Sequence, residues 1–246
     1  MMTGKTPAFY ALATSGAWKD YVNLLHIPYT LWHLSYVVLG AAVATTVHVD
    51  RLIGTLLAFF LAMGIGAHCL DELNGRPLGT RIPSTVLAAL AVVSIAGALA
   101  IGTVAGLEET LWLFAFMAFG AFIAVAYNLG LWHDRFHSDS WFAFAWGAFP
   151  VLTSYWIQSV TLTATAVLLA LACFTLSLAQ RTLSTQVRTI RRRTLNVAGT
   201  MEMTDGSVVK LDSSSMILPV ERALVLLSLT IVIFAGSLLA YRLLNS

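Results

Sequence analysis

A dense polar cluster directly follows one of the long apolar runs in this sequence. His68, Asp71 and Glu72 form the cluster, and Arg76 and Arg81 follow shortly after it. A charged side chain near the hydrocarbon of a membrane costs roughly 2.5–3.5 kcal/mol, so such a cluster indicates a cavity, a bound metal or partner charges. A helix end that has simply reached water is the alternative explanation.

The spacing of these residues predicts a shared face. If the preceding helix continues through residue 72, then His68, Asp71 and Glu72 occupy positions i, i+3 and i+4. Such a face can bind a metal or handle protons. Histidine and carboxylate ligands suit a transition metal, whereas Mg²⁺ prefers carboxylates, water and a substrate phosphate. The spacing does not decide between these ions.

A second polar group lies in the segment 133–139, which reads HDRFHSD. His133 and His137 are four residues apart in it, and Asp134 lies beside the first of them. Five of the six histidines fall near the predicted helix ends of one membrane side, and His48 is the exception. The alternative explanation is that the group 133–139 caps helix ends in the headgroup zone.

A membrane-embedded scaffold must position these residues. The 246 residues are 58% hydrophobic and 11% charged, with a mean hydropathy of +0.81, which is too apolar for a water-soluble domain. About 20 mostly apolar residues cross a bilayer as a helix, and runs of that length are too long for barrel strands. Seven such runs are predicted as spans, at roughly 28–48, 52–70, 84–106, 110–131, 140–158, 160–180 and 217–241.

The predicted fold is therefore an all-α, polytopic transmembrane bundle. Residues 1–27 are predicted to form a cytoplasmic or interfacial segment, and residues 28–246 a single bundle domain with a long loop at 181–216. The expected partner of such a bundle is the lipid bilayer, with no nucleic acid. Pro150 is expected to kink or loosen the fifth span, because its ring removes one helical hydrogen bond.

The distribution of charge predicts the orientation in the membrane. If the spans alternate, the amino terminus and the segments 71–83, 132–139 and 181–216 share one side, which carries eleven of the 14 Lys and Arg residues. Arg222 lies within the last predicted span, and Arg51 and Arg242 fall on the opposite side. Cytoplasmic segments are enriched in Lys and Arg. We therefore expect a plasma-membrane protein with its amino terminus inside the cell and its carboxyl terminus outside.

The segment 181–216 carries a basic run formed by Arg188, Arg191, Arg192 and Arg193. Arginines beside a bilayer attract anionic headgroups by about 1 kcal/mol each. They also make bidentate contacts with phosphate oxygens, so a diphosphate is the second explanation for this run. The sequence leaves both explanations open.

Several segments resemble the UbiA superfamily of intramembrane prenyltransferases. Residues 21–28 (YVNLLHIP) are similar to the amphipathic start of the first span in that family, and residues 71–83 (DELNGRPLGTRIP) to the end of its first aspartate-rich motif. Residues 127–129 (YNL) and 146–152 (WGAFPVL) resemble the connection between its fourth and fifth spans. The resemblance implies a helical bundle that uses Mg²⁺ to bind an isoprenoid diphosphate and transfers the prenyl group to an aromatic or lipidic acceptor.

The resemblance also implies roles for the two polar groups. Asp71 and Glu72 would bind the metal, with His68 in support, and both acids would be catalytic. Asp134 and His137 would orient or deprotonate the acceptor.

The implied substrate-binding residues come from neighbouring segments. Arg76, Arg81 and Arg181 would neutralise the diphosphate and stabilise the leaving group. Tyr127 and Asn128 would contact the substrate from the end of the fourth span.

The chain departs from the family in three ways. Met63 and Ala67 stand where the first motif has its Asn and first Asp, residues 177–186 contain no acid where the second motif belongs, and nine spans are usual. These departures motivate a second hypothesis, a non-catalytic protein that binds an isoprenoid or a quinone-like lipid, or serves as a subunit of a membrane complex. A metalloenzyme built on histidines and carboxylates, or a small transporter, is the third.

Overall fold

The computed structural model describes residues 8–12 and 16–245. It is 75% helical, and within the described part of the chain its strands form one short hairpin. The predicted all-α class is confirmed. Of the predicted amino-terminal segment 1–27, residues 1–7 and 13–15 lie outside the described residues, and the rest contains the short helix α1 (Trp18–Leu24).

The long helical segments coincide with the apolar runs of the sequence. They are α2 (Ile27–Ala42), α3 (Val49–Phe59) continued by η1 (Phe60–Ala67) and α4 (His68–Leu73), α5 (Ser84–Glu108), α6 (Leu113–Asn128), α8 (Asp139–Ala143) continued by η2 (Phe144–Ala148) and α9 (Phe149–Ser159), α10 (Ala164–Arg188) continued by η3 (Thr189–Arg193), and α11 (Ser213–Leu244). Four segments are long and apolar enough to cross a membrane: Val49–Leu73, Ser84–Glu108, Ala164–Arg193 and Ser213–Leu244. The chain therefore has the character of a helical membrane protein, and crossing by all seven segments stays a prediction.

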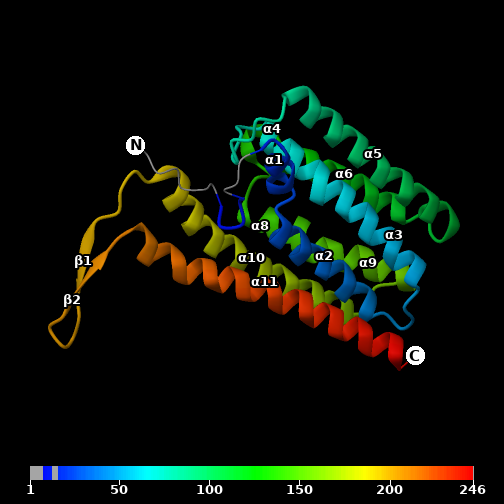
Figure 1. Cartoon of the computed structure of the whole chain (residues 1–246). Coiled ribbons are helices and arrows are strands. Elements are labelled where there is room, and N and C mark those ends of the chain that lie inside the picture. The colour runs from blue at the N-terminus through cyan, green and yellow to red at the C-terminus, as the bar shows by residue number, and fades with distance from the viewer. Residues whose placement is uncertain (1–7, 13–15, 246) are drawn as a thin grey trace.

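The central helix of the bundle is α2, which packs between α11 and α9 and also touches α3 and α10. Helix α5 covers α3 and η1 and is joined by α6, while α10 packs against α8, η2 and α11. Figure 1 shows α10 and α11 side by side, with the hairpin at one end of the bundle and the end of α11 at the other. The hairpin pairs β1 (Gly199–Glu202) with β2 (Val208–Leu211) in antiparallel register, Gly199 opposite Leu211.

One predicted boundary is wrong. The loop predicted at 181–216 is shorter, because α10 and η3 continue as helix to Arg193 and only residues 194–212 connect them to α11. The segment 181–193 contains no glycine or proline, and its Arg, Leu and Gln residues are good helix formers. The basic run therefore lies on a rigid helical element.

Small residues allow the helices around α2 to approach closely. A Cβ atom at Gly40 would lie 2.5 Å from the carbonyl oxygen of Val151, so α2 and α9 are in backbone contact there. The hydroxyl of Ser154 donates a hydrogen bond of 2.7 Å to the carbonyl oxygen of Val37 across the same interface. At the next interface, a Cβ atom at Gly147 would lie 2.7 Å from the carbonyl oxygen of Cys173 on α10.

Pro150 loosens its helix, as predicted. The preceding segment η2 is π-helical, and the N–H of Phe149 bonds to the carbonyl of Phe144, five residues back. Because proline has no N–H, it cannot bond to the carbonyl of Trp146 four residues before it. His33 on α2 satisfies that carbonyl with its Nδ1 at 2.8 Å. The break in α9 thus creates a polar contact between two apolar helices.

We predict that Gly40→Ala destabilises the protein by about 1–3 kcal/mol, because the added methyl group forces α2 and α9 apart. The matched control is Gly236→Ala on α11, where an added Cβ meets nothing within 4 Å. Alanine is the better helix former by about 0.8–1 kcal/mol, so this control does not lose stability. Thermal unfolding of both variants in detergent measures the difference, and equal midpoints would contradict the close contact.

Candidate functional site

A cavity of about 600 Å³, here called the polar chamber, opens at the end of the bundle that carries the hairpin. Its walls come from residues 8–10, His26 and α2, from η1 and α4, from the end of α6, from the segment before α8 with α8 and η2, and from α10 with η3. Its ionisable side chains are Tyr10, His26, Tyr29, His33, His68, Asp71, Tyr127, Asp134, His137, Arg181, Arg188, Arg192 and Arg193. The clustering of histidines that the sequence predicts is therefore present, apart from His133.

A second cavity of about 430 Å³, here called the apolar chamber, lies among α3, η1, α5, α6 and α9. Met63 and Trp146 line both chambers, so the two cavities meet at these residues. The far end of the apolar chamber is lined by Arg51 and Glu109, which form an ion pair. The bundle thus holds a polar space and an apolar space in direct succession.

His68 and Asp71 occupy the chamber side of α4, which is helical through residue 73 as the shared-face prediction requires. The ring of His68 lies 4.2 Å from the ring of His26, and its Nδ1 is 3.0 Å from the carbonyl oxygen of Gly64. Asp71 is close enough to Arg188 and His137 for their charges to act on it. Asp71 is therefore the acidic group that α4 presents to the chamber.

Glu72 points away from the chamber, although the sequence groups it with Asp71. Its side chain is 1% exposed, and its two carboxylate oxygens accept hydrogen bonds from the backbone N–H groups of Leu78 at 3.0 Å and Thr80 at 2.8 Å. Both oxygens therefore hold the loop between α4 and α5. The structure gives Glu72 an architectural role and no place beside Asp71 as a ligand.

Arg76 and Arg81 also lie outside the chamber wall. The guanidinium of Arg76 donates to the carbonyl oxygen of Ile82 and to the hydroxyl of Ser84, both at 2.6 Å. The backbone N–H of Arg81 donates to Asp20 on α1 at 2.9 Å. These contacts fold the loop onto α1 and α5, and neither arginine is among the residues that line the chamber.

The residues after α6 form the opposite wall. The rings of Tyr127 and His137 stack at 4.4 Å, and Nδ1 of His137 lies 2.8 Å from the carbonyl oxygen of Tyr127. Asn74 from the α4–α5 loop donates to the carbonyl oxygen of Asn128 at 3.0 Å. Tyr127, Asn128 and His137 thus lie together in the lining of the chamber.

Asp134 reaches the same wall from an unusual turn. In the turn after α6, which contains the short element α7 (Leu131–Asp134), three residues have left-handed backbone, with φ of 53° at Trp132, 58° at His133 and 61° at Asp134. Left-handed conformation costs roughly 1–2 kcal/mol for each such residue. Rings of Phe122, Phe136 and Trp132 pack together around the turn, which places Asp134 in the wall and leaves His133 exposed.

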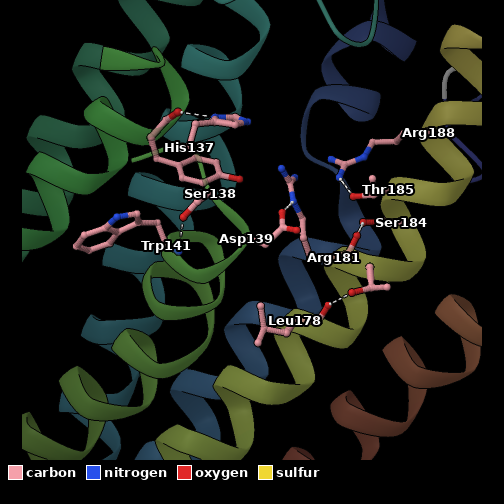
Figure 2. Close-up of polar contacts among 11 residues, drawn as sticks. His137, Ser138, Asp139, Trp141, Leu178, Arg181, Ser184, Thr185 and Arg188 are labelled. Carbon is pink, nitrogen blue, oxygen red and sulfur yellow. Dashed lines mark hydrogen bonds and ion pairs between the residues drawn. The ribbon is translucent and has the colours of Figure 1, made fainter. Parts of the chain in front are cut away.

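Helix α10 supplies the cationic wall. Arg181 forms an ion pair with Asp139 at 2.9 Å, and Arg188 donates to the hydroxyl of Thr185 at 3.0 Å (Figure 2). Gln180 lies in the same wall and is 2% exposed. Our sequence reasoning missed Gln180, although an amide inside an otherwise apolar helix is itself a signal of function.

Three histidines of the chamber share one hydrogen-bond pattern. Nδ1 of His33, His68 and His137 each faces a backbone carbonyl oxygen, at 2.8, 3.0 and 2.8 Å. A carbonyl oxygen can only accept, so each Nδ1 carries a proton and donates it to the backbone. The backbone carbonyls therefore fix the orientation of the three rings.

Two buried polar atoms of the chamber have no hydrogen-bond partner among the described residues. They are the hydroxyl of Tyr127, whose residue is 4% exposed, and Oε1 of Gln180. Buried polar groups are almost always hydrogen-bonded, so each exception calls for an explanation such as a water or a ligand. Both atoms belong to residues that line the polar chamber, which is the place for such a ligand.

His26 has an environment of its own between α1 and α2. Its backbone is left-handed, with φ of 45°, and its ring packs against Tyr10 and His68. Burial lowers the pKa of His26 well below its usual range, and the nearby His68, Arg192 and Arg188 lower it further. His26 is therefore neutral at physiological pH.

The side chains do not fit the Mg²⁺ site that the resemblance implies. No three His, Cys, Asp or Glu side chains of the described residues converge to hold a metal ion. Mg²⁺ requires near-octahedral oxygen ligands. Glu72 is bonded to backbone N–H groups, and Asp139 is paired with Arg181. Asp71 and Asp134 are the carboxylates that line the chamber, and no third ligand of the described residues joins them.

Comparisons of this chain with protein-family models, with curated proteins and with solved structures gave no match. The site is therefore interpreted from its own geometry and chemistry.

We predict that the adjacent acids Asp71 and Glu72 differ in their effect on stability. Glu72→Gln replaces one acceptor oxygen by an amide that faces a backbone N–H, and a lost hydrogen bond of this kind costs about 1–3 kcal/mol. The side chain of Asp71 accepts no hydrogen bond from the described residues. Asp71→Asn therefore changes the free energy of unfolding by less than about 0.5 kcal/mol. Thermal unfolding compares the pair, and a larger loss for Asp71→Asn would contradict the assignment.

We predict that His26 makes the protein less stable as the pH falls below about 6.5. In the unfolded chain His26 has the ordinary histidine pKa near 6.5, so below that pH it binds a proton that the folded protein does not bind. The free energy of unfolding therefore falls by up to about 1.4 kcal/mol for each unit of pH. His26→Gln removes this contribution, and His133→Gln, on the exposed turn, retains it. Unfolding midpoints between about pH 5 and 8 measure the slope. An unchanged slope in His26→Gln would contradict the prediction.

Proposed function

We propose that this protein is a divergent UbiA-like intramembrane prenyltransferase that acts on an isoprenoid diphosphate and a lipidic or aromatic acceptor. The observation that carries the proposal is the direct succession of the two chambers, which meet at Met63 and Trp146. An isoprenoid diphosphate has an anionic head and an apolar tail, joined at the carbon that reacts. The head matches the arginine-lined chamber, and the tail matches the apolar one.

The chemistry follows from this placement. When the bond between C1 of the prenyl group and the diphosphate oxygen breaks, the electron pair leaves with the diphosphate, and Arg181 and Arg188 stabilise the added charge. Positive charge develops at C1, close to the point where the two chambers meet. The aromatic rings of Tyr127 and Trp146 lie there and can stabilise a cation. The acceptor forms the new bond to C1, and its proton passes to Asp71 or to the free Nε2 of His137.

We propose that the protein crosses the membrane seven times and that the polar chamber opens to the cytoplasm. The loops at that end carry most of the Lys and Arg residues, which favours the cytoplasmic side. An amphiphile already dissolved in the bilayer could then reach its site without leaving the membrane. The plasma membrane, with the amino terminus inside, remains the proposed location.

A non-catalytic lipid-binding protein is the second candidate. It is favoured by the α10 wall, which has Gln180, Ser184 and Arg188 but no carboxylate. The histidines and Tyr127 could instead hydrogen-bond to the carbonyl groups of a quinone-like lipid. Such a protein, alone or as a subunit of a membrane complex, would bind its ligand without turnover.

We predict that purified protein in nanodiscs releases diphosphate from radiolabelled geranylgeranyl diphosphate when a suitable acceptor is present. Asp71→Asn removes a proton acceptor and lowers turnover by about 10²–10⁴-fold. Glu202→Gln, an exposed carboxylate in the hairpin, is the matched control and keeps wild-type turnover. Binding without diphosphate release for every acceptor class would replace the enzyme by the lipid-binding alternative.

A further inference from the structure

We propose that the polar chamber binds the diphosphate head through arginine side chains and requires no divalent cation. The inference rests on the proposed function for the identity of the ligand. It concerns how the charge of that ligand is neutralised, where the chain departs from the metal site implied by its resemblance.

The charge balance of the chamber is the first argument. Four arginines line it, Arg181, Arg188, Arg192 and Arg193, against the two aspartates Asp71 and Asp134. Arg181 is already paired with Asp139, whereas Arg188 forms no ion pair with any carboxylate of the described residues. Arg188 thus carries a positive charge that no carboxylate of the described residues pairs with, and a polyanion would neutralise it.

The absence of facing acids is the second argument. A cation between two walls needs oxygen ligands on both, but residues 164–193, which make up α10 and η3, contain no Asp or Glu. Elsewhere in the chamber, α4 presents Asp71 alone, because Glu72 is bonded to the backbone of Leu78 and Thr80. Asp134 also lines the chamber, but no third His, Cys, Asp or Glu of the described residues converges with these two acids to hold a metal ion. A metal held by phosphate and one carboxylate would also lie beside arginines that repel it.

The geometry of α10 is the third argument. Arg181 and Arg188 are two helical turns apart, about 10 Å along the axis, with Ser184 and Thr185 between them. The bond from Arg188 to Thr185 fixes the guanidinium, which can make bidentate contacts with phosphate oxygens. Across the chamber, the unpartnered hydroxyl of Tyr127 is a donor that also suits a phosphate oxygen. Arginine keeps its charge at all physiological pH values.

The test measures binding of geranylgeranyl diphosphate to the full chain in zwitterionic nanodiscs by titration calorimetry, once with EDTA and once with excess Mg²⁺. We expect dissociation constants that agree within about threefold. Arg188→Gln weakens binding by about 10- to 100-fold under both conditions, because charge-assisted hydrogen bonds are lost. Arg188→Lys keeps the positive charge but cannot make two parallel hydrogen bonds, so we expect its affinity to lie between those of the wild type and Arg188→Gln. Arg222→Gln, an exposed arginine on α11 outside the chamber, leaves the affinity unchanged.

Further arms separate the sources of phosphate. Inorganic diphosphate competes for the site, and nanodiscs rich in phosphatidic acid do not prevent binding. Binding that EDTA abolishes and Mg²⁺ restores would overturn the inference, as would normal binding by Arg188→Gln or saturation by the anionic lipid. Turnover that strictly requires Mg²⁺ would contradict this inference but support the proposed enzyme activity. Binding without a metal and without turnover would support the inference but contradict the enzyme activity.

Discussion

A polar group inside an apolar bundle is stable only when another group hydrogen-bonds to it or neutralises its charge. Pro150 illustrates the constraint, because it frees the carbonyl of Trp146 deep among apolar helices, and His33 then binds that carbonyl. The same rule fixes the rings of His68 and His137 on backbone carbonyls. The polar chamber exists because these partners come from several different helices, so its shape depends on the packing of the whole bundle.

The constraint also distributes the charged residues between two tasks. Glu72, Arg76 and Asp20 form hydrogen bonds with the backbone of the α4–α5 loop and hold it against the bundle. Asp71 and Arg188 line the chamber instead. The hydroxyl of Thr185 accepts a hydrogen bond from Arg188 there, and neither residue forms an ion pair with the described residues. Residues adjacent in the sequence therefore do different work, and the difference is set by which of them the loop can reach.

The sequence was a good guide to the elements and a partial guide to the site. Long apolar runs mark the helices because a bilayer demands length and hydrophobicity, and helical spacing correctly brought His68 and Asp71 to one wall. The same spacing could not show that Glu72 turns toward Thr80, since that depends on how a loop folds back over eight residues. Likewise, Arg76 and Arg181 were both predicted to bind the diphosphate, but only Arg181 lines the chamber. It does so from a helix that extends into the segment predicted as a loop.

The length of α11 has a practical consequence. Its 32 residues extend about 48 Å, whereas the hydrocarbon core of a bilayer is about 30 Å thick. It packs against its neighbour α10, and the two helices lead to the β1–β2 hairpin at one end of the bundle (Figure 1). The tip of this hairpin, at Asp205 and Gly206, is exposed and open on all sides. A small rigid domain inserted there would give electron microscopists an alignment marker for a protein otherwise hidden in its detergent belt.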